Sequence, residues 1–100
     1  MIRHIVCWCY KDDLTEQQKK EAGMKIKKDI ENLINLIDGI ISLEVIPEQL
    51  PSSSTELVLN SLFADEKALA NYQVHEEHVK VAQFIASVTK NRSCIDYIEN

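Results

Sequence analysis

Residues 2–10, IRHIVCWCY, are the most constraining segment of the chain, because their alternation predicts a β-strand with two largely apolar faces. One face would carry Ile2, His4, Val6, Trp8 and Tyr10, and the other Arg3, Ile5, Cys7 and Cys9. A strand of this kind is covered on both sides in a folded protein. The fold must therefore supply helices or a second sheet for each face.

A long helix is expected from Thr15 to about Ile37. It would begin at a capping box, in which the Thr15 hydroxyl and the Gln18 side chain satisfy free backbone amides. Gly39 is well placed just after the helix, where a left-handed backbone costs glycine least. Apolar residues spaced by threes and fours predict one buried face, formed by Ala22, Ile26, Ile30, Leu33, Ile34 and Ile37.

The remaining pattern predicts strands over 40–46, 56–64 and 92–98, a loop over 47–55, and helices over 66–74 and 76–90. The last helix would direct Val79, Ala82, Phe84 or Ile85, and Val88 inward. This order of elements is typical of an α+β, ferredoxin-like fold, with a four-stranded antiparallel sheet and helices on one face. The uncovered face would be apolar, so we expect a homodimer in which two such faces meet.

Composition excludes several classes of protein. The 100 residues suffice for one domain, spanning 1–100, and the 45% of hydrophobic residues excludes a disordered chain. The net charge of −5 comes without any basic stripe, so no nucleic-acid partner is expected. No segment resembles a signal peptide or a membrane span, so we expect no membrane partner and a cytoplasmic location.

The three cysteines, Cys7, Cys9 and Cys94, cannot all pair within one chain. Their spacing lacks a fourth ligand for structural zinc, so we interpret them as reduced, small apolar residues. The sequence also lacks a glycine-rich phosphate loop and a haem motif. We therefore expect no metal and no cofactor.

Several segments resemble the stress-responsive α/β-barrel family. The most specific are Met-x-x-His-Ile-Val at the start and Tyr-x-x-His-x-x-His within ALANYQVHEEH, supported by GIISLEVIPE, ELVLNSLFAD and RSCIDYIE. The resemblance implies a dimeric α+β barrel with a pocket between sheet and helices in each subunit. Its members include plant stress proteins, bacterial proteins of unassigned role, and a plant polyketide cyclase that closes aromatic rings without a cofactor.

The same resemblance implies a catalytic set of His4, Tyr72 and His78. In that reading His78 is a general base, Tyr72 donates a hydrogen bond to a developing oxyanion, and His4 orients or polarises the substrate. These residue types suit such chemistry, because imidazole can act as a base near neutrality and a phenol in a dry pocket stabilises an enolate-like oxygen. The pocket is predicted to include Val6, Trp8, His75 and Phe84, with His75 at a break between two helices. The ligand would be a small apolar or aromatic molecule.

Three alternatives stay open. His4 could simply hydrogen-bond to Tyr72 or His78, so that the cluster only satisfies buried polar groups in a non-catalytic stress or structural dimer. His75, His78 and His4 could together bind a metal, although no supporting carboxylate is evident from the sequence. A cofactor-free monooxygenase of a related barrel type is the third alternative, although its motifs are not found.

Overall fold

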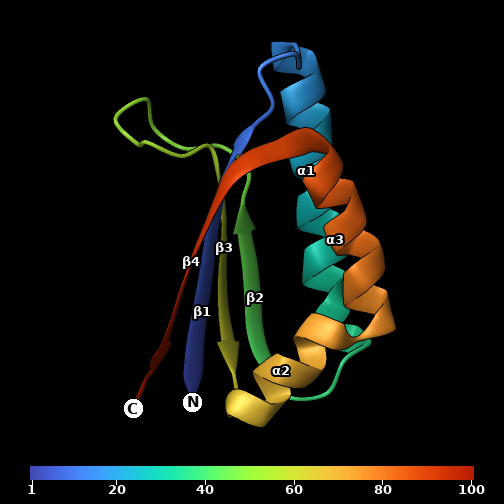
Figure 1. Cartoon of the computed structure of the whole chain (residues 1–100), viewed down its shortest axis with the longest axis vertical. Helices are drawn as coiled ribbons and strands as arrows, with labels where there is room; N and C mark the ends of the chain where they lie inside the picture. Colours follow the sequence, from blue (N-terminus) through green and yellow to red (C-terminus); the bar gives the residue numbers. More distant parts are fainter.

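The computed structural model describes residues 1–100, which form a four-stranded antiparallel sheet with helices on one face (Figure 1). In chain order the elements are β1 (Ile2–Tyr10), α1 (Glu16–Asn32), the 3-10 helix η1 (Leu33–Asn35), β2 (Ile40–Ile46), β3 (Leu57–Phe63), α2 (Glu66–Val74), α3 (Glu76–Val88) and β4 (Thr89–Ile98). The ferredoxin-like α+β fold expected from the sequence is therefore confirmed. None of the helices combines the length and apolar character needed to span a membrane.

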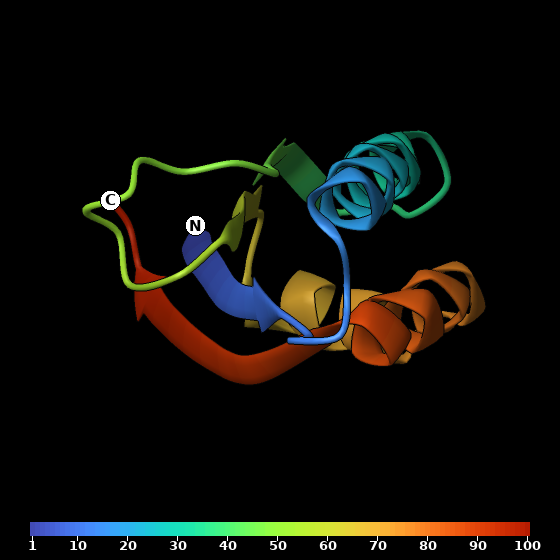
Figure 2. The same ribbon diagram turned by 90° about the horizontal axis from the view of Figure 1, so that it is seen from above.

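β1 is an inner strand of the sheet, whose order is β2-β3-β1-β4. Its even-numbered residues face the helices and are at most 7% exposed, as the alternation predicts. Figure 2 shows the helices on one side of the sheet, while the loop between β2 and β3 extends away from them. β4 lies at the edge, and residues 91–98 are exposed throughout. The core is therefore formed by β1, β2 and β3 together with the helices.

α1 begins at the predicted capping box, in which Thr15 Oγ1 accepts a hydrogen bond from the Gln18 amide at 3.1 Å. The buried face is largely as expected, and Ile26, Ile30 and Leu33 are each 1% exposed. The prediction of one helix reaching Ile37 is wrong, because α1 ends at Asn32 and η1 follows. The tighter winding of a 3-10 helix shifts the side chains around the axis, which leaves Ile34 41% exposed rather than buried.

His75 separates α2 from α3, as the sequence predicts. Its backbone is extended, with ψ of 136°, so it ends one helix and begins the next. The His75 side chain caps α3 by accepting a hydrogen bond from the Glu77 amide to Nδ1 at 3.1 Å. This break turns α3 away from the axis of α2, so Tyr72 and His78 need not follow the periodicity of one helix.

The end of α3 differs from the prediction. The helix stops at Val88 instead of Lys90, and β4 begins directly at Thr89 instead of Arg92. The Thr89 hydroxyl donates to the Ile85 carbonyl at 2.7 Å, which satisfies part of the helix terminus while the backbone becomes extended. The register with β1 then shifts near Asn91, whose φ of 55° is a left-handed conformation that asparagine tolerates.

The sheet face opposite the helices carries exposed apolar side chains. Ile95 is 57% exposed, Tyr97 45% and Ile46 40%. Arg3 is the charged residue of β1 on this face, and its guanidinium is paired with Glu99 at 2.7 and 2.9 Å. This surface, which we call the outer face, therefore combines exposed apolar side chains with a paired arginine and the exposed Glu44, which the strand register places on the same face as Ile5.

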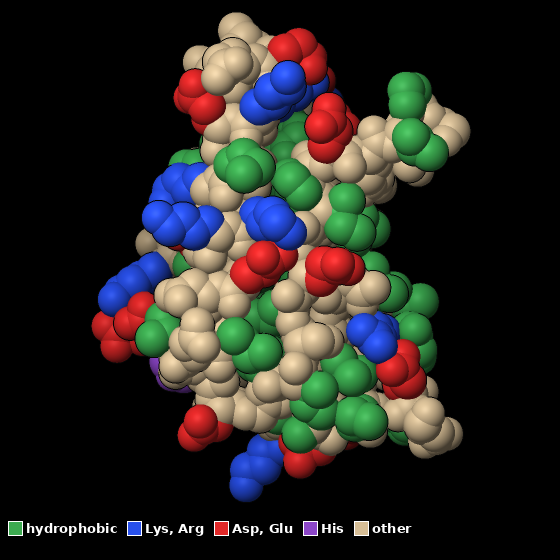
Figure 3. Space-filling model, turned by 180° about the vertical axis from the view of Figure 1, so that it is seen from behind, with side chains coloured by type: hydrophobic (Ala, Val, Ile, Leu, Met, Phe, Trp, Pro, Cys, Tyr) green, Lys and Arg blue, Asp and Glu red, His purple; other side chains and the backbone are tan.

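The side of the molecule opposite the view of Figure 1 carries charges of both signs together with hydrophobic side chains (Figure 3). Lys and Arg side chains lie next to Asp and Glu side chains, with hydrophobic side chains between them. On α1 the pairs are Lys25–Asp29 and Lys27–Glu31, each at 2.7 Å. The charges on this side therefore do not form a field of one sign.

Candidate functional site

A cavity of about 170 Å³ lies on the helix side of the sheet, among residues of β1, β3, β4 and the helices. Its lining is mostly apolar, with a few polar side chains. It is formed by His4, Val6, Trp8, Ile30, Leu59, Tyr72, Gln73, His78, Ala82, Ile85 and Arg92. Five residues singled out from the sequence thus share one cavity, namely His4, Val6, Trp8, Tyr72 and His78.

His4, Tyr72 and His78 form a continuous aromatic cluster. The ring centroids of Tyr72 and His78 lie 4.3 Å apart, and those of His4 and Tyr72 lie 6.4 Å apart. His4 comes from the middle of β1, Tyr72 from the last turns of α2, and His78 from the first turns of α3. The helix break at His75 brings the last two together, in keeping with the expectation that they converge.

The Tyr72 hydroxyl is the most unusual group in the cavity. The residue is 1% exposed, and its oxygen has no hydrogen-bond partner within the protein. Buried hydroxyls are nearly always hydrogen-bonded, so an unpartnered hydroxyl on a residue that lines the cavity is unusual. Burial also raises the pKa of the Tyr72 phenol, which keeps it protonated and able to donate.

The His78 ring is held in one tautomer by its backbone contact. Nδ1 lies 3.1 Å from the Gln73 carbonyl oxygen, which can only accept, so Nδ1 carries the hydrogen. The Nε2 lone pair is then available as a base. Burial lowers the pKa of His78, and this outweighs the hydrogen bond to the Gln73 carbonyl, which acts in the opposite direction; the nearby guanidinium of Arg92 also lowers it. His78 is therefore neutral, and able to accept a proton, near neutral pH.

His4 is held by a partner that the sequence did not reveal. Its Nδ1 donates to the carboxylate of Asp96, which lies directly across from it on β4. The His4 side chain is 3% exposed and that of Asp96 42%, so the carboxylate connects a buried imidazole to the surface. In the sequence, Asp96 only shares a strand face with Cys94 and Ile98. The register of β4 against β1 was needed to find it, and no local motif signals that register.

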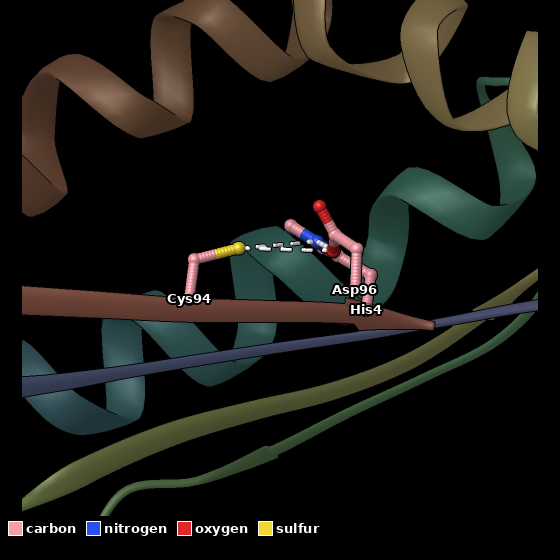
Figure 4. A group of neighbouring side chains, drawn as sticks. All are labelled: His4, Cys94 and Asp96. Carbon is pink, nitrogen blue, oxygen red and sulfur yellow. Dashed lines mark hydrogen bonds and ion pairs between the residues drawn. The ribbon is translucent and has the colours of Figure 1, made fainter. Parts of the chain in front are cut away.

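Cys94 completes a small group around the same imidazole (Figure 4). Its sulfur lies 3.7 Å from His4 Nδ1 and 3.7 Å from an Asp96 carboxylate oxygen. Desolvation and the neighbouring carboxylate raise the pKa of the Cys94 thiol. Cys94 is thus separated from Cys7 and Cys9, which face the other side of β1.

Two predicted pocket residues do not line the cavity. His75 uses its Nδ1 to cap α3 and lies outside the cavity that His4 and His78 line. The three histidines therefore do not come together as the ligands of one metal ion. The Phe84 ring lies under the ammonium group of Lys25, 4.9 Å from its centroid, and packs against the edge of the core. Ile85, the next residue of α3, lines the cavity in its place, because one position along a helix rotates the side chain by about 100°.

A second, larger hollow of about 590 Å³ lies between α1 and the loop over residues 47–55. It is lined mainly by polar and charged residues, and it contains none of the predicted catalytic residues. Tyr10 lies at its base, where its hydroxyl donates to the Pro47 carbonyl at 2.9 Å. Burial and two nearby glutamates raise the pKa of Tyr10 to about 12. The hydroxyl is satisfied here, in contrast to that of Tyr72.

The fold and the cavity define a ferredoxin-like α+β subunit with a small aromatic site on the helix side of its sheet. The chain belongs to the Dabb family, the stress responsive A/B barrel domain, whose family profile matches residues 2–99. This establishes the family indicated by the sequence motifs. No functionally curated protein matches the sequence.

Solved structures with the same fold come from bacteria and plants. A protein of Bacteroides fragilis, described as dimeric, of unknown function and ferredoxin-like, is 29% identical with a TM-score of 0.90, covering 96% of this chain and 93% of that one. A Dabb family protein of Mesorhizobium loti is 25% identical with a TM-score of 0.76, covering 99% and 96%. The hydroxynitrile lyase of Passiflora edulis is 19% identical with a TM-score of 0.80, covering 99% and 93%, and at this identity the likeness concerns the fold alone.

Proposed function

We propose that the protein works as a homodimer whose subunits each bind a small apolar or aromatic compound in the cavity around Tyr72. We further propose that a bound carbonyl compound undergoes proton transfer there without a cofactor. The observation that carries the proposal is the buried Tyr72 hydroxyl, which belongs to a residue lining the cavity and has no partner in the protein. Such a group favours a ligand with a hydrogen-bond acceptor, because an unpaired buried hydroxyl costs free energy.

The size and lining of the cavity indicate the class of ligand. An apolar cavity of about 150 Å³ in a protein can hold a benzene molecule, so a cavity of about 170 Å³ fits a compound with one ring. Val6, Trp8, Leu59 and Ile85 would contact the apolar part of that compound. Arg92 adds a positive charge to the lining. A neutral or weakly anionic single-ring ligand matches these features.

The orientation of the polar groups supports proton transfer beside a carbonyl. His78 Nε2 would take a proton from the carbon next to the carbonyl group, and the electrons of that C–H bond would move to the carbonyl oxygen. The Tyr72 hydroxyl would donate to this oxygen as it becomes negative. Return of a proton to carbon would regenerate the carbonyl compound with its α-proton exchanged, whereas protonation of the oxygen would give the enol. His4, held by Asp96, would orient the ligand from the sheet side.

The dimer is supported by the outer face. Its apolar residues, including Ile95 and Tyr97, are exposed in a single subunit, and an exposed apolar patch of this kind marks an interface. The similar protein of Bacteroides fragilis is described as dimeric. Two outer faces packed across a two-fold axis would bury these side chains. The cavity lies on the opposite, helix side and stays separate from this contact.

Trp8 provides a direct assay of binding, because it is the only tryptophan and it lines the cavity. Titration with phenylacetone, a one-ring ketone, should quench or shift its fluorescence, whereas a three-ring ketone should have little effect. His78→Ala should abolish or strongly weaken this response with little change in melting temperature. His75→Ala is the matched control, because it removes a helix cap, which should lower the stability by about 1 kcal/mol without weakening binding.

Proton transfer is tested by the exchange of the ketone's α-protons in D₂O, followed by NMR. The wild-type protein should accelerate the exchange, and His78→Ala should return it to the buffer rate. If His78→Ala instead mainly lowers the melting temperature while the Trp8 response is unchanged, the histidine is structural. Absence of any Trp8 response to single-ring ketones would favour a non-catalytic dimer and contradict the proposal.

A further inference from the structure

Three different metal-binding side chains meet at the edge of the sheet beside the cavity. The donor atoms of His4, Cys94 and Asp96 all lie within 4.8 Å of one another (Figure 4). They converge because β1 and β4 are antiparallel neighbours in which His4 is paired with Asp96, and Cys94 lies two residues earlier on the same face. The arrangement is thus fixed by strand register and not by a flexible loop.

The spacing of these atoms suits a tetrahedral cation. With zinc–sulfur distances of about 2.3 Å and zinc–nitrogen or zinc–oxygen distances of about 2.0–2.2 Å, neighbouring ligand atoms lie about 3.3–3.6 Å apart. The two distances from Cys94 Sγ, both 3.7 Å, are already close to this spacing. The direct contact between His4 and Asp96 must lengthen, and the His4 hydrogen must move from Nδ1 to Nε2 so that the Nδ1 lone pair is free for the cation. The Asp96 side chain is 42% exposed and has room to rotate.

The chemistry and access of the group also favour a cation. Nitrogen, sulfur and carboxylate oxygen together are a ligand set typical of zinc, and a bound cation displaces the thiol proton. The His4 ring is oriented by edge contacts with Phe63 and Tyr72, at centroid distances of 6.0 and 6.4 Å. Cys94 and Asp96 are exposed, so an ion can enter from solvent on the helix side of the sheet.

We propose that His4, Cys94 and Asp96 bind one zinc ion, or a similar divalent cation, in each subunit. The group contains three protein ligands, which leaves a fourth position for water. We expect such a site to bind its ion reversibly and not to be needed for folding, because Cys94 and Asp96 are exposed and lie outside the hydrophobic core. His4 also lines the cavity, but this proposal does not depend on the proposed function, since it rests on strand register and ligand spacing, and neither Cys94 nor Asp96 lines the cavity.

Cobalt(II) titration of the metal-free, reduced protein tests the proposal directly. A thiolate bound to cobalt gives a charge-transfer band in the near ultraviolet, and we expect this band to saturate at one ion per chain. Zinc should then displace the cobalt and remove the band. Cys94→Ser should abolish the band and weaken zinc binding at least tenfold, and Asp96→Asn should weaken zinc binding about tenfold or more. Cys7→Ser is the matched control and should bind like the wild type, because Cys7 faces the other side of β1.

Cys94→Ser changes an exposed residue, so its far-ultraviolet circular dichroism and melting temperature without metal should match those of the wild type. Phenylacetone binding, read from Trp8 without metal, should also be unchanged in Cys94→Ser, so loss of the metal site and failure of the proposed function are separable. The proposal is overturned if the wild-type protein binds neither cobalt nor zinc. It is equally overturned if Cys94→Ser keeps the band, or if Cys7→Ser loses it.

Discussion

Replacing Tyr72 by phenylalanine should make the protein more stable while it removes function. The change deletes only the hydroxyl and keeps the ring, whose centroid lies 4.9 Å from that of Phe63 and 4.3 Å from that of His78. The deleted oxygen is buried without a partner, and a buried unsatisfied polar group costs about 1–3 kcal/mol. Relief of the lower part of this cost would raise the free energy of unfolding by about 1 kcal/mol. In a domain of this size that corresponds to a melting temperature higher by about 4–8 °C.

Tyr10→Phe is the matched control, because it removes the same atom from a hydroxyl that donates to the Pro47 carbonyl at 2.9 Å. Its loss should lower the stability by about 1 kcal/mol. The two variants should therefore differ by about 2 kcal/mol in urea unfolding at equal protein concentration. The response of Trp8 fluorescence to phenylacetone should be lost in Tyr72→Phe and kept in Tyr10→Phe. The reasoning is refuted if Tyr72→Phe is destabilised as much as Tyr10→Phe, since its hydroxyl would then be satisfied within the protein.

Three further predictions concern the dimer, a helix contact and the effect of pH. Ile5→Glu places a charge on the outer face and should yield monomers in sedimentation experiments, whereas an unchanged dimer would show that this face is not the contact. Gly23→Ala should lower the stability by about 1–2 kcal/mol in thermal unfolding. The added carbon would lie 2.5 Å from Tyr10 Oη and 2.9 Å from Pro47 Cβ, and this crowding outweighs the gain in helix propensity. A stabilised variant would contradict this prediction. Because burial lowers the pKa of His78, the folded state favours its neutral form. The contribution of His78 to the stability is therefore complete above about pH 6.5, and it is lost as the pH falls toward the lower pKa that His78 has in the folded protein. Proton exchange of the ketone should fall with protonation of His78 in that acidic range, and a rate that rises on acidification would contradict its role as a base.

The helices and strands could be predicted where hydrophobic residues recur at the regular spacing of a helix or a strand. The alternation in β1 and the spacing of Ile26, Ile30 and Leu33 on α1 follow from backbone geometry alone. The sequence did not reveal that the helix tightens after Asn32, because a 3-10 turn has no distinct apolar pattern. For the same reason the exposure of Ile34 could not be foreseen.

Part of the candidate site could be predicted from the family resemblance and not from hydrophobic periodicity. The cluster of His4, Tyr72 and His78 came from a family resemblance, and the helix break at His75 explains how two of these residues meet. Asp96 was missed because its position against His4 depends on the pairing of strands that are far apart in the chain. Long-range register is set by the whole packed sheet and by the irregularity near Asn91, so local sequence could not reveal it.

The proposal that the cavity around Tyr72 is the binding site of the protein is tested most directly by a crystal structure grown with phenylacetone. We expect the ligand ring among Val6, Trp8 and Ile85, with its carbonyl oxygen accepting a hydrogen bond from the Tyr72 hydroxyl and its α-carbon beside the His78 ring. A ligand bound instead in the polar hollow beside the 47–55 loop, with the Tyr72 hydroxyl still unpaired, would contradict it.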